Sequence, residues 1–527
     1  MRARASLACG ATTALLLTLL PSTALAQTVE FTSLRIMRDK GILTQAEYDA
    51  ALADLQSTSG DRAAESTSLV VGKWSTTLYG FAEADFIHDT TQSFNDSAGN
   101  AQVARPNASA LVPVTYAGDN GRTTFSVRNS RLGLRFRAPE YHRVSVSGML
   151  ETDFLGAQPA ITTGSGEGAY FTSPVLRVRH AMARVETPVV DVLVGQYWDL
   201  FGWQGVYAPN AVEIQGLPGQ LYSRDIQLRV SKTLKTDAVT FEIAAAAVRP
   251  PSRNSQVPDL QGGLRFAVNH WKGIMTAGAT GTSVMPASIA VTGDSRHFQV
   301  PEFSQLPTQS VSKDVQSVAV DAFIPIIPQS SEKHGNALSL TGEFVYGNGI
   351  SNLYTGLTGG MTFPTVPNTS SMSPAPTYPQ DVDNGMVVYD TAGNLHAIQW
   401  TTFIVGLQYY LPAVQGKLWV SANYSRQVSA DFHQSSISPT GACISGSCSA
   451  TSDFTAPPGM VANPNNSTYV ATVESVRHSL DWFDVNVFSQ LTPAFRIGVE
   501  YANFNDFYTD GTHATNHRVQ ASGFLIF

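Results

Sequence analysis

Residues 130–154 alternate between hydrophobic and polar side chains with a period of two, which predicts β-strands because successive strand side chains point to opposite faces. In the first half, the apolar face carries Leu132, Leu134 and Phe136. The opposite face carries Arg131, Gly133, Arg135 and Arg137. After a turn at 138–142 the alternation resumes, with Glu151 and Asp153 on the polar face. We therefore expect a β-hairpin with one apolar and one charged face.

Similar segments recur from Trp74 to Phe527, about sixteen in all, an even number as in single-chain bacterial barrels. In one of them, Leu176, Val178 and Met182 oppose Arg177, Arg179, Ala181 and Ala183. Two others are expected at 260–269 and 274–282, joined by a turn at 269–272. The pattern predicts an all-β fold, a transmembrane antiparallel β-barrel over residues 74–527.

Short turns alternate with long polar connections along the chain. The long connections span 90–122, 155–174, 199–222, 283–312, 346–400 and 427–476. A membrane barrel with short periplasmic turns and long extracellular loops produces this alternation. A secreted sandwich or propeller has no reason to keep its long loops at one end.

The last segment also favours a membrane barrel. Its apolar face carries Val519, Ala521, Gly523, Leu525 and Phe527. An amphipathic last strand that ends in phenylalanine resembles the signal by which bacterial outer-membrane barrels are recognised for insertion. Aromatic residues near other strand ends fit the girdles of such barrels.

The N-terminal residues differ from the rest. Residues 1–26 combine two arginines, an apolar run and an Ala-Leu-Ala site, which is typical of a secretory signal peptide. Residues 27–56 predict a short helical segment, with a capping box at Thr44 to Glu47, and residues 57–73 a polar linker. We expect the helical segment to be periplasmic and to pack on a partner chain or the barrel base; a loosely ordered stub is the alternative.

Composition narrows the possible partners. Removal of the signal peptide changes the formal charge from −8 to −10, because it takes away two arginines and no acidic residue. An acidic chain with 14% charged residues is a poor nucleic-acid binder. Cys443 and Cys448 are expected to form a disulfide in an oxidising compartment. No companion ligands for a metal lie near them, and we expect neither a metal nor another cofactor.

If the apolar faces contact lipid, the charged faces must line the lumen, because every strand hydrogen bond is used within the closed ring. The expected pore-lining residues are Arg131, Arg135, Arg137, Arg177, Arg179, Arg229, Glu151 and Asp153. A wall rich in arginine favours anions, since the guanidinium holds carboxylate or phosphate through two hydrogen bonds. The alternative is that these charges pair with one another and only make the wall rigid.

The connection 199–222 contains Trp203, Tyr207 and Glu213 together with several prolines and glycines. Such a composition favours a packed loop. In a barrel wide enough for an aqueous channel, we expect this loop to fold inward and narrow the pore. The alternative is an outward loop that contacts a second subunit.

Several motifs resemble those of the DcaP-like trimeric porins of the bacterial outer membrane. They are Arg131-Leu-Gly-Leu-Arg-Phe, Glu151-Thr-Asp-Phe, Leu176-Arg-Val-Arg-His-Ala, Val194-Gly-Gln-Tyr-Trp and residues 216–230. The resemblance implies a homotrimer in outer-membrane lipid, passive uptake of small anions such as dicarboxylates, and pore-lining roles for Arg131, Arg135, Arg177 and Arg179. Phosphate-selective porins have a similar architecture and are the nearest alternative.

Two other function classes are less consistent with the sequence. A barrel-borne hydrolase needs a nucleophile, a base and an orienting group at one site, but the histidines are scattered and no Gly-x-Ser-x-Gly motif precedes a helix. We therefore do not expect an enzyme. A surface adhesin that uses the long loops is the remaining alternative.

Overall fold

The computed structural model describes residues 68–71, 74–98, 102–105, 115–156, 174–302, 308–329, 335–355, 382, 386–389, 395–431, 477–508 and 512–527. The predicted signal peptide (1–26), the helical segment (27–56), part of the linker (57–73), and Cys443 and Cys448 lie outside these residues. Within the expected linker, Ser68–Val71 form a strand, β1, that pairs with the first barrel strand.

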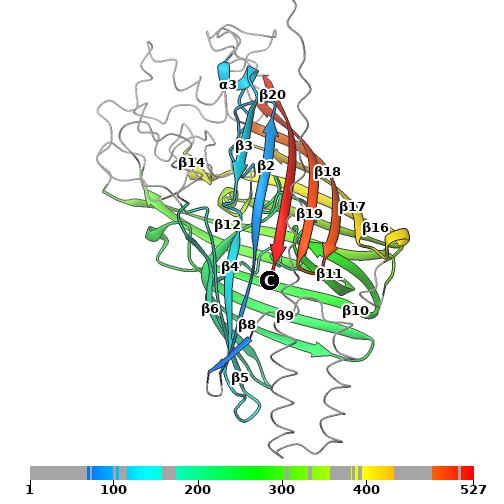
Figure 1. Cartoon of the computed structure of the whole chain (residues 1–527). Coiled ribbons are helices and arrows are strands. Elements are labelled where there is room, and N and C mark those ends of the chain that lie inside the picture. The colour runs from blue at the N-terminus through cyan, green and yellow to red at the C-terminus, as the bar shows by residue number, and fades with distance from the viewer. Residues whose placement is uncertain are drawn as a thin grey trace, which may run out of the picture. The chain divides into compact units, whose positions relative to one another are not determined.

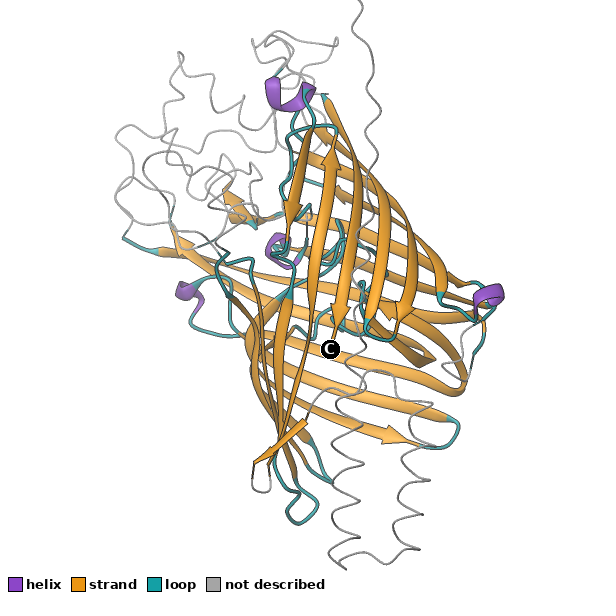
Figure 2. Ribbon diagram, viewed as in Figure 1, coloured by secondary structure: helices purple, strands orange, loops and turns teal. Residues whose placement is uncertain are grey.

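The described chain forms a closed antiparallel barrel of sixteen strands (Figures 1 and 2), which confirms the predicted all-β fold class. The first eight strand segments are β2 (Trp74–Asp89), β3 (Arg122–Ser126), β4 (Arg131–Arg137), β5 (Ser145–Asp153), β6 (Arg177–Glu186), β7 (Asp191–Trp198), β8 (Arg224–Lys235) and β9 (Val239–Val248). The others are β10 (Asp259–Ala277), β11 (Gly281–Pro301), β12 (Ser310–Ile327), β13 (Ala337–Asn348), β16 (Gln399–Tyr410), β17 (Leu418–Ser429), β18 (Arg477–Thr492), β19 (Phe495–Tyr508) and β20 (His513–Ile526).

β2 closes the ring. It pairs with β20 on one side, and on the other with β3 and β4, which together make one barrel strand. The remaining elements are small. They are the hairpin β14 (Val387–Tyr389) and β15 (Leu395–Ala397), the one-turn helix α3 (Tyr116–Asp119), and the 3₁₀ turns η1 (Arg253–Ser255), η2 (Ser351–Leu353) and η4 (Pro412–Val414). No helix among the described residues is long and apolar enough to span a membrane.

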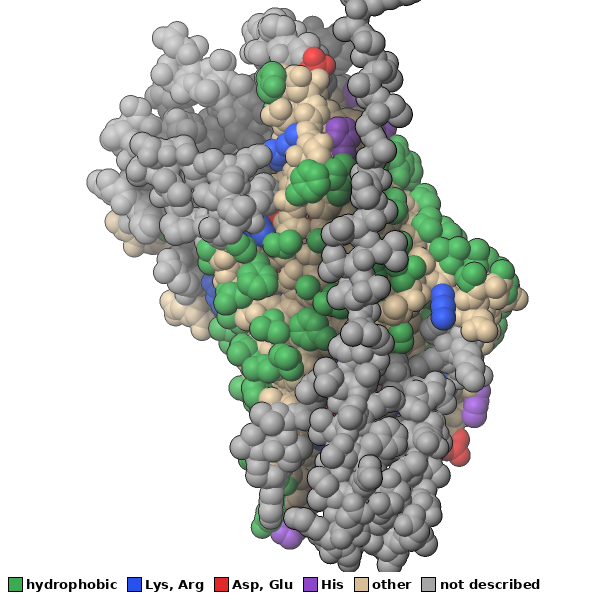
Figure 3. Space-filling model, viewed as in Figure 1, with side chains coloured by type: hydrophobic (Ala, Val, Ile, Leu, Met, Phe, Trp, Pro, Cys, Tyr) green, Lys and Arg blue, Asp and Glu red, His purple; other side chains and the backbone are tan. Residues whose placement is uncertain are grey.

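The outer face of the wall is hydrophobic. Leu78, Leu132 and Leu150 lie on the neighbouring strands β2, β4 and β5 and are 39–44% exposed. Hydrophobic side chains cover much of the described wall in Figure 3. An exposed apolar surface of this extent is unusual for a protein in water and matches the lipid-facing band of a membrane barrel.

Two sequence-based boundaries are wrong. The expected turn at 269–272 is a bulge, because β10 continues to Ala277 with a register shift between Val268 and Lys272. The ninth strand is therefore β11, which occupies most of the expected loop 283–312. The inward side chains of β11 include Ser288, Thr292 and Asp294, which are small or polar. This composition resembles that of a loop and explains the wrong boundary.

A second bulge changes the side-chain pattern of β6. Glu151 pairs with His180 and Thr152 with Val178, so that Arg179 is an extra residue between them. A bulge of this kind reverses the alternation beyond it. Contrary to expectation, Ala181 and Ala183 are exposed on the outer face, whereas Arg179 and His180 both point inward and are buried.

Candidate pore and its arginine wall

The connection between β7 and β8, residues 199–223, lies inside the barrel and is called here the inner loop. Backbone N–H groups of Val212 and Glu213 donate to Oε2 of Glu500 on β19, at 2.8 and 2.9 Å. The N–H of Leu221 donates to Oε1 of Glu343 on β13, at 2.9 Å. The inner loop thus crosses the interior from its own strands to the opposite wall.

The three aromatic and acidic residues expected in this loop are buried. Trp203 packs over Gly263 of β10, where a side chain would collide with the indole. The hydroxyl of Tyr207 donates to Oγ of Ser288 at 3.0 Å. Glu213 forms an ion pair of 3.2 Å with Arg518 of β20. Burial raises the pKa of Glu213 to about 8, although Arg518 opposes the shift.

Two other segments pack into the same side of the barrel. The connection after β2 enters from one side, where the N–H of Val103 donates to Asp506 at 2.8 Å. Residues after β13 pack on the inner loop, and the N–H of Tyr222 donates to the carbonyl of Leu353 at 2.9 Å. The inward side chains of the opposite strands are consequently buried to 5% exposure or less: Gln408, Tyr410, Ser421, Asn423, Asn486, Arg496, Glu500 and Gln520.

The wall formed by β4 to β8 differs, because several of its inward side chains contact water. The side chain of Arg177 is 33% exposed and that of Arg131 is 20% exposed. Arg135 and Arg137, further along β4, are exposed. Among the described residues, the water-accessible inner surface therefore follows this side of the barrel, and it continues to Glu242 on β9 and Arg265 on β10, whose side chains are 22% and 15% exposed.

Arginines and two carboxylates meet on this wall. Arg177 binds Asp153 through two hydrogen bonds of 2.6 and 3.0 Å. Arg179 bridges Glu151 at 2.8 Å and Asp153 at 3.0 Å and is fully buried. Arg131 lies 3.6 Å from Glu151. The period of two alone places Arg177 and Arg179 on the same side, and the bulge in β6 turns His180 to that side as well.

The sequence analysis missed a fourth arginine, Arg224, at the start of β8. Its guanidinium carbon lies 4.9 Å from the ring of Trp198 and 5.1 Å from that of Tyr222. We call Arg131, Arg177, Arg179 and Arg224, with Glu151 and Asp153, the arginine wall. Four guanidinium groups face two carboxylates, so this wall carries excess positive charge. Trp198 is the last residue of β7, and Tyr222 lies two residues before β8 begins. This aromatic pair was the signal that could have located Arg224.

Tyr222 of the inner loop connects to the arginine wall. Nη2 of Arg179 donates to its hydroxyl at 3.1 Å, and that hydroxyl donates to the carbonyl of Ile214 at 3.1 Å. Burial alone would raise the pKa of the phenol, but the nearby guanidinium groups of Arg179 and Arg224 outweigh burial and lower the pKa to about 8.

Two of the other predicted residues have mainly local contacts. Arg135 stacks over Tyr79 with its guanidinium carbon 4.0 Å from the ring centre. Arg229 donates to the carbonyl of Trp198 at 2.5 Å and to Gln227 at 2.9 Å. Among the residues that the structure describes, no group of three or more His, Cys, Asp or Glu side chains could hold a metal ion.

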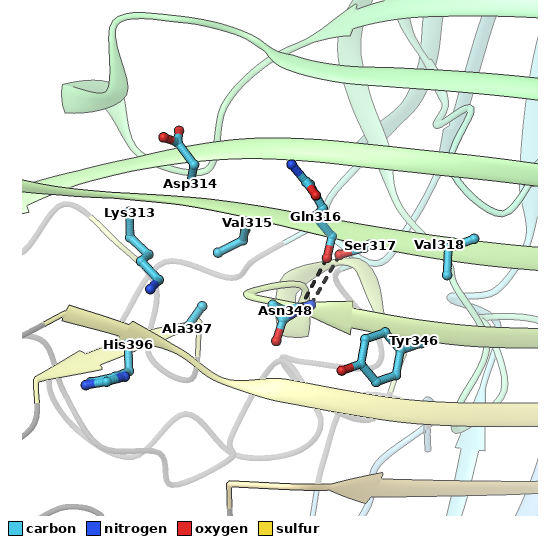
Figure 4. Close-up of a pocket in the computed structure, with 10 residues that line it drawn as sticks. All are labelled: Lys313, Asp314, Val315, Gln316, Ser317, Val318, Tyr346, Asn348, His396 and Ala397. Carbon is cyan, nitrogen blue, oxygen red and sulfur yellow. Dashed lines mark hydrogen bonds between the residues drawn. The ribbon is translucent and has the colours of Figure 1, made fainter.

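A separate hollow of about 640 Å³ lies away from the arginine wall, on β12, β13 and β15. Figure 4 shows its lining side chains, among them Lys313, Tyr346 and His396. Asn348 bridges β13 to β12 there, with its backbone N–H 3.2 Å from Oγ of Ser317 and its side chain 3.3 Å from the carbonyl of Gln316.

A closed, even-numbered antiparallel barrel with an apolar outer band and a loop folded into its lumen has the architecture of the outer-membrane porins. The structure resembles the outer-membrane channel DcaP of Acinetobacter baumannii, with a TM-score of 0.56 and 17% identity, over 87% of this chain and 99% of that one. The fold is therefore the one that the motif resemblance implied.

More distant matches include the anion-selective porin of Comamonas acidovorans, with a TM-score of 0.44 and 9% identity over 86% of this chain and 100% of that one. A loop-deletion mutant of OmpT, an outer-membrane protein of Vibrio cholerae, matches with a TM-score of 0.42 and 10% identity over the same shares of the two chains. No model of a known protein family matches the chain, and no curated protein sequence matches it.

Proposed function

We propose that this protein is a porin of the bacterial outer membrane that lets small hydrophilic solutes diffuse passively and prefers anions. The observation that carries the proposal is the position of the water-accessible inner surface, which follows the arginine wall while the opposite side is filled. A solute that crosses the lumen must then pass partly exposed guanidinium groups. These replace part of the hydration of an anion and repel a cation.

The proposed location rests on the outer surface and on the similar fold. The apolar outer band suits contact with outer-membrane lipid, and the fold is that of a known outer-membrane channel. In this arrangement the short turns and residues 27–56 are periplasmic. A homotrimer is proposed by analogy with the DcaP-like porins, and the inner loop takes the role of the constriction.

Dicarboxylates are the anions proposed as preferred solutes. Arg131 and Arg177 each keep part of the side chain in contact with water. Two such groups on one wall match a solute with two carboxylates, since each guanidinium can hold a carboxylate through paired hydrogen bonds. Glu151 and Asp153 reduce the local positive charge, which keeps binding weak enough for release.

Planar bilayers test the channel activity. The refolded mature protein is expected to produce stepwise increases in conductance, and a folded protein that produces no steps would overturn the proposal. Liposome swelling with succinate, phosphate, a neutral sugar and lysine then ranks the solutes. We expect succinate to enter fastest and lysine slowest. Faster entry of phosphate than of succinate would favour a phosphate-selective porin instead.

A further inference from the structure

The hairpin formed by the end of β10 and the start of β11, residues 272–286, leaves the barrel wall. β10 pairs with β9 only from Asp259 to Val268, and β11 pairs with β12 only from Ser288 to Pro301. Between these limits the two strands pair only with each other, from Lys272–Pro286 to Ala277–Gly281. The barrel is therefore closed without this segment, which is called here the inward hairpin.

The inward hairpin reaches strands that are not its neighbours. Gln408 of β16 binds both backbone groups of Thr276, accepting from its N–H at 2.8 Å and donating to its carbonyl at 3.1 Å. Oγ of Ser339 on β13 donates to the carbonyl of Ile274 at 2.6 Å. Because two barrel strands separate β11 from β16, these contacts require the hairpin to cross the interior.

The tip of the hairpin is held by a buried cation. Arg496 of β19 donates to the carbonyl of Ala279 at 2.5 Å and to Oγ1 of Thr282 at 3.1 Å. Its guanidinium carbon lies 4.7 Å from the ring of Trp419, and the residue is 5% exposed. None of the ion pairs found among the described residues involves Arg496. A buried guanidinium still requires hydrogen-bond acceptors, and the hairpin supplies two of them.

The inward hairpin and the inner loop also contact each other directly. The N–H of Gly278 donates to the carbonyl of Pro209 at 3.0 Å, and the side chain of Asn210 donates back to the carbonyl of Gly278 at 2.6 Å. Ile274 and Ala279 belong to one buried cluster with Val212 of the inner loop. Met275, on the other face of the hairpin, packs in the cluster of Trp203 and Tyr207.

We propose that the inward hairpin is a second constriction element, which together with the inner loop sets the largest solute that passes and confines the water path to the arginine wall. This inference rests on the proposed porin function. Backbone N–H and C=O groups of the hairpin form hydrogen bonds with side chains of β13, β16 and β19 instead of with a neighbouring strand of the barrel wall. Its position fills the lumen cross-section next to the inner loop, which no requirement of barrel closure explains.

Shortening the hairpin tests the proposal. Replacement of residues 274–284 by Asn-Gly joins the paired residues Gly273 and Met285 through a two-residue turn that suits a β-hairpin, since Met285 has the backbone N–H that such a turn needs and Pro286 does not. Single-channel conductance is expected to rise about twofold or more, because it follows the cross-section of the narrowest water path. Larger neutral sugars should enter liposomes, and anion preference should fall only slightly because the arginines are untouched.

A point variant keeps the test valid if the shortened protein does not fold. Gln408→Ala removes the clamp on Thr276 and should raise conductance and current noise, whereas Leu407→Ala, which points outward on the same strand, should leave both unchanged. Wild-type conductance and sugar cut-off in the variants that fold would overturn the second constriction. A wild-type protein without any conductance would instead overturn the porin function on which it rests.

Discussion

The arginines of the pore wall divide by their exposure. Arg179 is fully buried between Glu151 and Asp153, which suits the role of holding the wall rigid. Arg131 and Arg177 keep part of the side chain in contact with water. Of the two alternatives weighed for these arginines, a rigid wall suits Arg179, whereas the proposed anion preference rests on Arg131 and Arg177.

We predict that Arg131→Ala combined with Arg177→Ala shifts the zero-current potential in a salt gradient toward cation selectivity, because the arginine wall then has two guanidinium groups facing two carboxylates and loses its excess positive charge. Arg426→Ala is the control, since that arginine is half-exposed in a pair with Asp481 outside this wall. The proposed anion path is wrong if the double variant keeps the wild-type potential.

Tyr222 gives the channel a predicted pH dependence. With a pKa near 8, its phenol loses a proton between about pH 7 and pH 9 and adds a negative charge beside Arg179 and Arg224. Anion preference should therefore decrease as the pH rises through this range. Glu213 of the inner loop, with a pKa also raised to about 8, titrates over the same range in both proteins. The zero-current potential of Tyr222→Phe should therefore drift less than that of the wild type, and an equal drift in both proteins would exclude this tyrosine as a cause.

Side-chain alternation predicted most inward and outward positions, including Arg131, Arg177 and Glu151. It failed after Arg179, because a bulge inserts one residue and the sequence carries no local mark of it. Arg224 was missed for a related reason. Trp198 and Tyr222 mark the two ends of the inner loop in the sequence, but only the three-dimensional path of that loop brings Tyr222 beside both Arg224 and Arg179.

At the scale of elements, close contact between β6 and β7 depends on Gly195. Its φ is 120°, and a Cβ atom there would lie 2.3 Å from the carbonyl oxygen of Ala181. Gly195→Ala should lower the free energy of unfolding by about 1–3 kcal/mol, the usual cost of such strain. Denaturant titration of the barrel in detergent measures this change.

Gly262 provides the matched control for that variant. It lies in β10, and a Cβ atom added there would meet no atom within 4 Å. Gly262→Ala should change the free energy of unfolding by less than about 0.5 kcal/mol, as is usual for surface positions. Equal losses in the two variants would mean that backbone contact at Gly195 is not what limits stability.

The elements that alternation located well are those with apolar outer faces, such as β4, β5 and β20. β11 was lost because Ser288, Thr292 and Asp294 on its inward face resemble a polar loop. The inward hairpin was lost because residues 273–276 are buried in succession and show no alternation. A period of two in the hydrophobic and polar residues identifies a strand with one solvent-facing side and one apolar side. It does not distinguish a wall strand from a hairpin that has turned into the lumen.

At the scale of the whole molecule, the interior of the described barrel is filled unevenly. The inner loop, the segments after β2 and β13, and the inward hairpin all pack against β13 to β20. The arginine wall on β4 to β8 remains in contact with water. Excess positive charge and open space thus coincide on one side of the barrel, and this coincidence is the reason for proposing anions as the preferred solutes.

The zero-current potential of the wild-type protein in a planar bilayer, measured across a potassium chloride gradient near neutral pH, tests that claim most directly. We expect a potential of the sign that chloride permeation produces, and a reduced magnitude at high salt, where surface charges are screened. A potential of the sign that potassium permeation produces would contradict it.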